Sequence, residues 1–64
     1  MVNVETRDSI RFEILRRDVK LYRLAARLDV HPSRLGRILR GREPMTEDLA
    51  ARLRTAIEAE EPRD

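Results

Sequence analysis

Apolar side chains recur every three or four positions along most of the 64-residue chain, and short polar breaks interrupt them. This spacing is typical of amphipathic helices. It predicts helices over about residues 4–17, 21–28, 32–40 and 47–60. We therefore expect an all-α fold, a compact bundle of four or five short helices. Residues 1–64 are expected to form a single domain with a frayed tail at 61–64.

Residues at the expected helix ends support these boundaries. Asn3 or Thr6 is expected to cap the first helix and Thr46 the last, because side-chain oxygens accept hydrogen bonds from the unpaired N–H groups there. Pro32 suits the first position of the third helix, where a missing N–H costs little. Gly41 suits the left-handed residue that ends this helix. The third helix is thus bounded on both sides by its own sequence.

The expected core gathers the large apolar residues of all four segments and their connections. Its predicted members are Ile10, Ile14, Leu15, Val19, Leu24, Leu28, Val30, Leu35, Ile38, Leu39, Leu49, Leu53 and Ile57. A core of this size rarely supplies more than roughly 3–5 kcal/mol, so a partner or a second copy would add stability. Candidate dimer contacts are Met45, Ala56 and Ile57 around the last helix, and Phe12, whose alternative is a partly exposed ring packed by the N-terminal arm.

Residues 24–41 read LAARLDVHPSRLGRILRG and predict two short helices joined by Asp29, Val30 and His31. Ala25 is small enough for the second helix to cross the first closely, which is the arrangement of a helix-turn-helix. We place this motif at about residues 21–40. The solvent side of its second helix is expected to carry Ser33, Arg34, Arg37 and Arg40, and such a face suits DNA.

This stretch resembles the helix-turn-helix of the lambda-repressor-like (phage repressor and Cro-type) DNA-binding domains. The family pattern is approximately L-A-x-x-L-G-V-x-P-S-x-[hydrophobic]-S-x-[hydrophobic]-x-x-G. It is matched here by Leu24, Ala25, Leu28, Val30, Pro32, Ser33, Leu35, Ile38 and Gly41. Two positions differ from this pattern: Asp29 stands for Gly and Gly36 for Ser. Before the pattern, Lys20-Leu21 stands where many members of the family carry Thr-Gln.

The resemblance implies a sequence-specific transcriptional regulator of double-stranded DNA, a repressor of phage or prokaryotic type in the cytoplasm at the nucleoid. A homodimer is expected to place the helix at 32–40 of each copy in the major groove of a pseudo-palindromic operator. Base contacts are expected from Ser33, Arg34 and Arg37, since arginine pairs in bidentate fashion with guanine. Phosphate contacts are expected from Lys20, Tyr22, Arg23, His31, Arg40 and Arg42.

Several of these residues have a second interpretation that the sequence leaves open. His31 is also suited to cap the helix that begins at Pro32, and Tyr22 to be a half-buried ring with a wet tip. Ion pairs of Arg34 or Arg37 with Asp29 would compete with DNA. Gly36, lacking a side chain, would let the helix sit deep in the groove or pass a thymine methyl.

The distribution of charge supports a polyanionic partner. The chain carries a net charge of +2, but residues 7–42 hold eleven basic and four acidic side chains, while residues 43–64 hold three basic and seven acidic ones. The basic segment coincides with the proposed helix-turn-helix. A protein-interaction module, antitoxin-like or an adaptor for polymerase or another regulator, is the alternative; it would use Phe12 and the acidic last helix.

Composition argues against other classes. The chain has no cysteine and one histidine, and it has no Gly-rich phosphate loop or paired nucleophile and base, so we expect no enzyme, cofactor or metal site. No small-molecule ligand is expected either. The longest apolar run is far shorter than a membrane span, and no signal-peptide pattern is present, so no membrane partner is expected.

Overall fold

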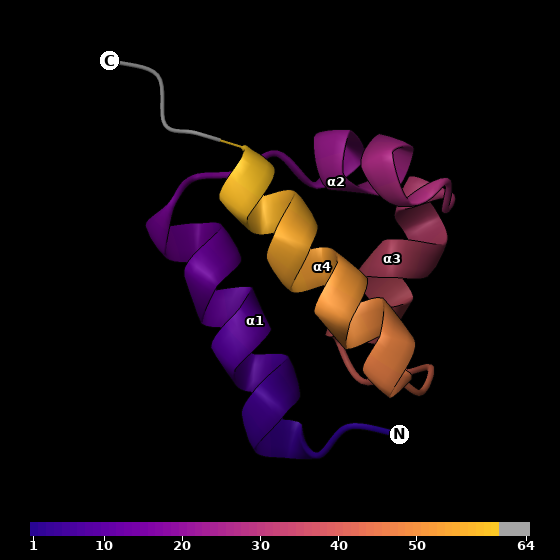
Figure 1. The fold of residues 1–64 in the computed structure, drawn as a ribbon. Helices are drawn as coiled ribbons and strands as arrows, with labels where there is room; N and C mark the ends of the chain where they lie inside the picture. The colour runs from indigo at the N-terminus through magenta and orange to yellow at the C-terminus, as the bar shows by residue number, and fades with distance from the viewer. Residues whose placement is uncertain (61–64) are drawn as a thin grey trace.

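The computed structural model describes residues 1–60, in which four helices surround one apolar core (Figure 1). They are α1 (Val4–Arg16), α2 (Leu21–Leu28), α3 (Pro32–Leu39) and α4 (Glu47–Ala59). The predicted all-α bundle is confirmed, and each helix ends within one residue of its expected position. The frayed tail expected at 61–64 lies outside the described residues.

The helices form a closed ring of neighbours around the core. Helix α4 packs against both α1 and α2, and α3 packs against both α2 and α1. Figure 1 shows α1 and α4 side by side, with their C-terminal ends at the same end of the bundle. Only three residues connect α2 to α3, so these two helices are held close by the chain itself.

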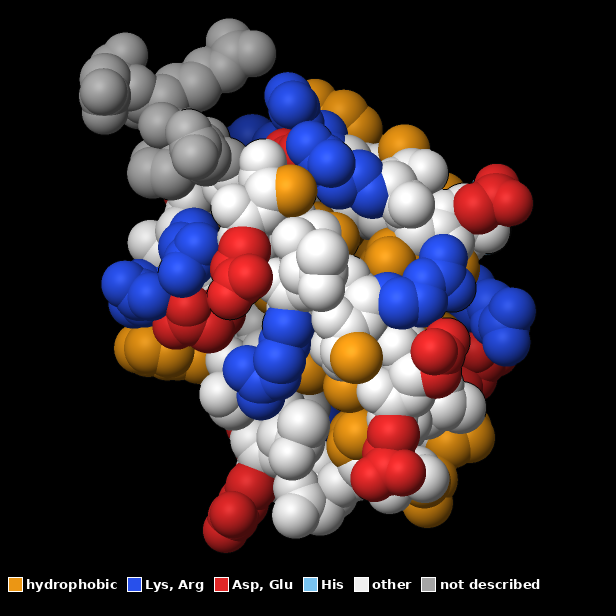
Figure 2. Space-filling view, viewed as in Figure 1, with side chains coloured by type: hydrophobic (Ala, Val, Ile, Leu, Met, Phe, Trp, Pro, Cys, Tyr) orange, Lys and Arg blue, Asp and Glu red, His pale blue; other side chains and the backbone are white. Residues whose placement is uncertain are grey.

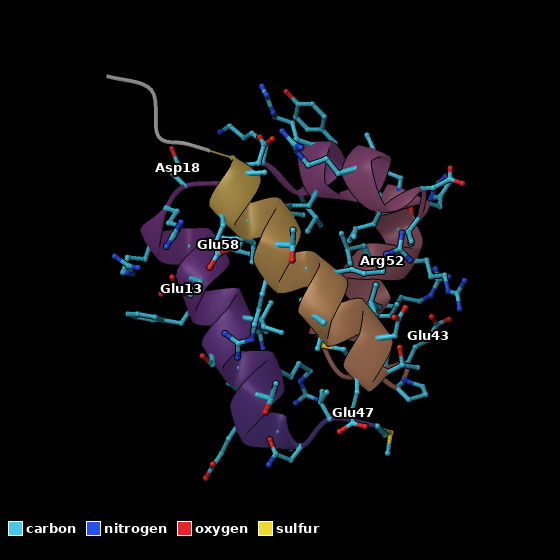
Figure 3. The ribbon with its side chains drawn as sticks, in the orientation of Figure 1. Glu13, Asp18, Glu43, Glu47, Arg52 and Glu58 are labelled. Atoms are coloured by element: carbon cyan, nitrogen blue, oxygen red, sulfur yellow. The ribbon has the colours of Figure 1, made fainter. Side chains whose placement is uncertain are left out.

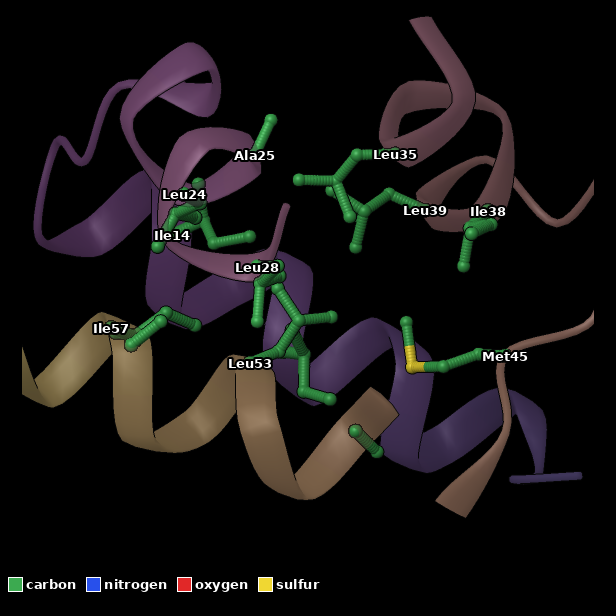
Figure 4. Packing of buried hydrophobic residues seen from close by; sticks show 13 residues of the cluster. Ile14, Leu24, Ala25, Leu28, Leu35, Ile38, Leu39, Met45, Leu53 and Ile57 are labelled. Atoms are coloured by element: carbon green, nitrogen blue, oxygen red, sulfur yellow. The ribbon is translucent and has the colours of Figure 1, made fainter. Parts of the chain in front are cut away.

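Thirteen apolar residues are buried, and every helix contributes to them (Figure 4). They are Ile10, Ile14, Leu24, Ala25, Leu28, Leu35, Ile38, Leu39, Met45, Ala50, Leu53, Ala56 and Ile57. Of the predicted core, Val19, Val30 and Leu49 are only partly buried against this cluster. Ala25, at which a close approach of α3 is expected, is 1% exposed.

The sequence pattern predicts that Leu15 belongs to the core, and this prediction is wrong. Its side chain is 77% exposed. Adjacent residues of a helix point about 100° apart, so with Ile14 directed into the core Leu15 faces solvent. Phe12 is also exposed, at 61%.

The dimer contacts suggested around the last helix are also wrong. Met45, Ala56 and Ile57 are between 2% and 6% exposed, because all three are part of the core of the monomer. Met45 lies in the connection before α4, and its backbone carbonyl accepts a 2.9 Å hydrogen bond from the N–H of Val2. This bond ties the N-terminal segment to the loop that follows α3.

Side chains cap the first and last helices as the sequence predicts. The Asn3 side chain accepts a hydrogen bond from the N–H of Thr6 at 2.8 Å, so Asn3 is the cap of α1. The Thr46 hydroxyl accepts one from the N–H of Leu49 at 3.1 Å. Both bonds satisfy donors that the helix itself leaves unpaired.

Each of the first three helices is followed by a residue in the left-handed conformation, at Asp18, Asp29 and Gly41. The next residue then donates its N–H to a carbonyl five positions back, in the pattern of a Schellman motif. These bonds join Val19 to Ile14 (3.1 Å), Val30 to Ala25 (3.0 Å) and Arg42 to Arg37 (2.9 Å). The chain therefore reverses abruptly after α1, α2 and α3.

Replacing Gly41 by alanine is expected to destabilise the protein by about 1–2 kcal/mol, because a left-handed backbone is unfavourable for residues with a Cβ. Gly41 has φ +83°, and a Cβ there would lie 2.5 Å from the Arg7 guanidinium. Urea denaturation followed by circular dichroism measures the change. Gly36→Ala is the matched control: Gly36 lies inside α3, where a Cβ would come no closer than 3.4 Å to Arg40, and alanine is favoured in helices. Equal stability losses for both variants would contradict the left-handed cap.

Candidate nucleic-acid interface

The solvent face of α3 is polar and basic along its whole length. Ser33, Arg34 and Arg37 of α3 are exposed, and so is Arg40, which directly follows the helix. The other side of the helix, with Leu35, Gly36, Ile38 and Leu39, is buried. The helical period of 3.6 residues places the four exposed residues side by side. We call them the α3 basic face. The three residues expected to contact bases all belong to it.

One carboxylate bridges the two arginines in the middle of the α3 basic face. Glu43 accepts from Arg34 Nε through Oε2 at 3.3 Å and from Arg37 Nε through Oε1 at 3.4 Å. The two arginine side chains remain 63% and 46% exposed. The ion pairs with Asp29 considered from the sequence are wrong, because both arginines pair with Glu43.

The arginine that follows α3 lies close to Gly36. A Cβ at Gly36 would lie 3.4 Å from Arg40 Nη1, and Gly36 itself is buried. The Arg40 side chain therefore covers the residue at which the sequence suggested that the helix would sit deep in the groove or pass a thymine methyl. Arg40 is exposed, as a phosphate contact requires.

His31 caps α3. Its Nδ1 accepts a hydrogen bond from the N–H of Ser33 at 3.1 Å, and Pro32 occupies the first turn as expected. An imidazole that accepts at Nδ1 carries its proton on Nε2. The capping interpretation is confirmed, and the opposite edge of the exposed ring keeps a donor.

The phosphate-contact candidates of α2 differ in their surroundings. Lys20 and Tyr22 are exposed, and the Tyr22 side chain at 64% is too open for the half-buried ring considered above. Arg23 pairs with Glu60 at 2.6 Å, and Arg27 pairs with the same carboxylate at 2.5 Å. The Glu60 side chain is only 9% exposed, so this acidic group at the end of α4 holds both arginines against the bundle.

Near the loop after α3, Arg42 is exposed, whereas Arg7 is drawn inward from α1. The Arg7 guanidinium lies against Gly41, and its Nε is buried without a hydrogen-bond partner. Its contact with Asp8 is only a 4.0 Å ion pair. Arg7 therefore joins α1 to the end of α3, a role that the sequence did not reveal.

The sequence did not reveal which residues pair with the arginines of α2 and α3, or which residue bonds to the end of α2. Glu43, Glu60 and Arg52 are the main examples, and Figure 3 labels Glu43 and Arg52. Arg52, which lies on α4, donates a 3.0 Å hydrogen bond from Nη2 to the carbonyl of Leu28. It thereby satisfies a carbonyl at the C-terminal end of α2. A signal existed only for Glu43, because the reversal at Gly41 returns the following residues toward α3.

The two arginines beside Glu60 hold the pKa of this carboxyl below its ordinary value of 4.5, chiefly through the hydrogen bond from Arg27. The pKa of Glu13 is lowered in the same way, first by the hydrogen bond from Arg16. The carboxylates are therefore more stable as anions in the folded state than in the unfolded state.

Lowering the pH is expected to destabilise the protein through Glu60. A lowered folded-state pKa contributes stability that is complete above the unfolded-state pKa and is lost as the pH falls through the folded-state pKa. The free energy of unfolding is thus expected to fall from about pH 5 downward, and the decline to be shallower in Glu60→Gln. Urea titrations between pH 3 and pH 7 measure it, with Glu58→Gln as control. Parallel curves for Glu60→Gln and the wild type would contradict the role of Glu60.

Within residues 1–60 no three histidine, cysteine or acidic side chains gather as they would around a metal ion. None of the four helices has the length and apolar character needed to cross a membrane.

No family model, curated protein or solved structure matches this chain.

Proposed function

We propose that this protein binds double-stranded DNA as a sequence-specific transcriptional regulator, acting as a repressor. The observation that carries the proposal is the α3 basic face, four exposed polar residues of which three are arginines, on a helix whose opposite side is fully packed. Packing of the opposite side fixes the position of the helix, and the major groove admits one α-helix. In this proposal α2 and α3 form a helix-turn-helix.

In the proposed complex the first turn of α3 meets the base edges. Ser33 and Arg34 lie in that turn, and Arg37 follows one turn later on the same face. Arginine donates two parallel hydrogen bonds to O6 and N7 of guanine, so we expect at least one guanine in each half-site. Glu43 occupies the Nε donor of both arginines, so its carboxylate competes with DNA for them.

The remaining candidates are proposed to bind the phosphates on either side. Lys20 and Tyr22 flank the start of α2, His31 offers the free edge of its ring, and Arg40 and Arg42 follow α3. Arg23 is a weaker candidate than the others because Glu60 already neutralises it. Each cation that contacts a phosphate adds a salt-dependent term that is independent of sequence.

The experiment that tests the proposal is selection of bound duplexes from a random-sequence pool at two salt concentrations, followed by sequencing. We expect an enriched two-fold-symmetric motif with half-sites about one helical turn, or about 34 Å, apart. Weak binding without an enriched motif but with a steep salt dependence would overturn sequence-specific regulation. The α3 basic face would then be an electrostatic surface only, and the alternative, a protein-interaction module, would be preferred.

Replacing Glu43 by glutamine is expected to tighten binding to random-sequence DNA about two- to thirtyfold, because exposed ion pairs are worth roughly 0.2–1 kcal/mol each and two are removed. Fluorescence anisotropy with a labelled duplex measures the change. Glu58→Gln makes the same change in net charge on a different part of the surface (Figure 3). If both variants tighten binding equally, overall charge and not the bridge is responsible.

A further inference from the structure

Helix α1 carries an exposed apolar surface that the monomer leaves uncovered. Val4 is 58% exposed, Phe12 61% and Leu15 77%, and these are three of the five large apolar side chains exposed in residues 1–60. Ile10 and Ile14 face the core from the opposite side of the same helix. We call the side with Val4, Asp8, Phe12, Leu15 and Arg16 the outer face of α1.

Charges on the outer face of α1 are arranged symmetrically about Phe12. Asp8 lies four residues before Phe12 and Arg16 four residues after it. The ring therefore has a negative side chain about one helical turn away on one side and a positive side chain about one turn away on the other. The Asp8 and Arg16 side chains are 57% and 54% exposed. Their partners within the helix are Arg7 and Arg11, at 4.0 Å and 3.9 Å from Asp8, and Glu13, at 2.8 Å from Arg16.

This arrangement is complementary to itself when a second copy runs in the opposite direction. With a two-fold axis at Phe12, Asp8 of each copy faces Arg16 of the other, and the two Phe12 rings meet at the axis. Leu15, three residues beyond, then covers the flank of the partner's ring. Such an isologous contact is the usual solution for a homodimer, and two identical ion pairs form in it.

We propose that a second copy of this chain binds the outer face of α1, in an antiparallel helix pair centred on Phe12. The proposal supplies the contact surface for the dimer invoked under the proposed function, but its test needs no nucleic acid, so either can fail alone. The contact uses no residue of α3, so the α3 basic face stays available in both copies.

The dimer is expected to be weak. A helix of thirteen residues is only about 20 Å long at 1.5 Å per residue, so one helix from each copy forms an interface below the usual size of a stable complex. Self-association is therefore expected in the micromolar range or weaker, and two half-sites on one operator would favour it by holding the copies together.

Sedimentation equilibrium of the full chain, from micromolar to millimolar concentration and without DNA, tests the proposal. We expect a monomer–dimer equilibrium that Phe12→Ser and Leu15→Ser each weaken at least tenfold. Both side chains are exposed, so circular dichroism should show unchanged folding. Tyr22→Ser removes an equally exposed aromatic ring from α2 and should leave the equilibrium unchanged. A wild-type monomer at all concentrations, or a dimer that both α1 variants retain, would overturn the proposal.

A charge exchange tests the antiparallel direction. Asp8→Arg alone places like charges opposite each other twice and is expected to weaken the dimer at least tenfold. Adding Arg16→Asp restores opposite charges and is expected to return the dissociation constant to within about threefold of the wild type. If the double variant dimerises as weakly as Asp8→Arg alone while its helicity is preserved, this register is ruled out.

Discussion

Replacing Leu53 by alanine is expected to leave a large fraction of the protein unfolded at 37 °C. Leu53 is fully buried, and removing a buried leucine side chain costs about 2–5 kcal/mol. A core in a chain of this length supplies only roughly 3–5 kcal/mol in total, so one substitution removes most of it. Thermal denaturation followed by circular dichroism at 222 nm measures the loss.

Leu15→Ala is the control for this experiment, because it makes the same chemical change at a residue that is 77% exposed. It is expected to shift the melting temperature by only a few degrees when measured in dilute solution. Similar melting temperatures for the two variants would contradict the assignment of Leu53 to the centre of the core.

Replacing Arg37 by alanine is expected to weaken binding to the selected DNA sequence by about 1–3 kcal/mol, or roughly five- to 150-fold, and to relax specificity at one base position. Arg37 lies in the middle of the α3 basic face, where an arginine is suited to bidentate contact with guanine. Titrating the variant with the selected duplex, and with duplexes altered at single positions, measures both effects.

Arg42→Ala removes the same positive charge from the loop after α3 and serves as the matched comparison. As a phosphate contact, Arg42 is expected to contribute equally to all sequences, so its loss weakens specific and random DNA alike and lowers the salt slope by about one. Equal losses on specific and random DNA for both variants would contradict this division between base and phosphate contacts.

Helix ends could be predicted from the sequence because the residues that set them act locally. The side chains of Asn3, Thr46 and His31 each accept a hydrogen bond from a backbone N–H two or three positions away. Gly41 adopts the left-handed conformation because it lacks a Cβ. These interactions depend on neighbouring residues and not on the rest of the fold. The exposure of the four residues on the α3 basic face follows from the helical period in the same way.

Contacts between distant segments could not be predicted. Most neighbours of Met45 in the sequence are polar. Met45 is nevertheless buried, because the loop after α3 returns over the core. Leu15 was wrongly assigned because α1 has apolar residues on two sides, and the pattern alone does not say which side packs. Exposed ion pairs such as those of Glu43 are worth about 0–1 kcal/mol and impose no visible constraint on the sequence.

The short connections between helices also bear on the rate of folding. Four residues separate α1 from α2, three separate α2 from α3, and seven separate α3 from α4. Helical domains dominated by such local contacts fold in microseconds to milliseconds. The pairing of α4 with α1 joins the most distant segments, so it closes the largest loop and is expected to complete the fold last. Because folding on this timescale is fast, the apolar faces of the helices are exposed only briefly. Aggregation is therefore not expected to compete effectively with folding.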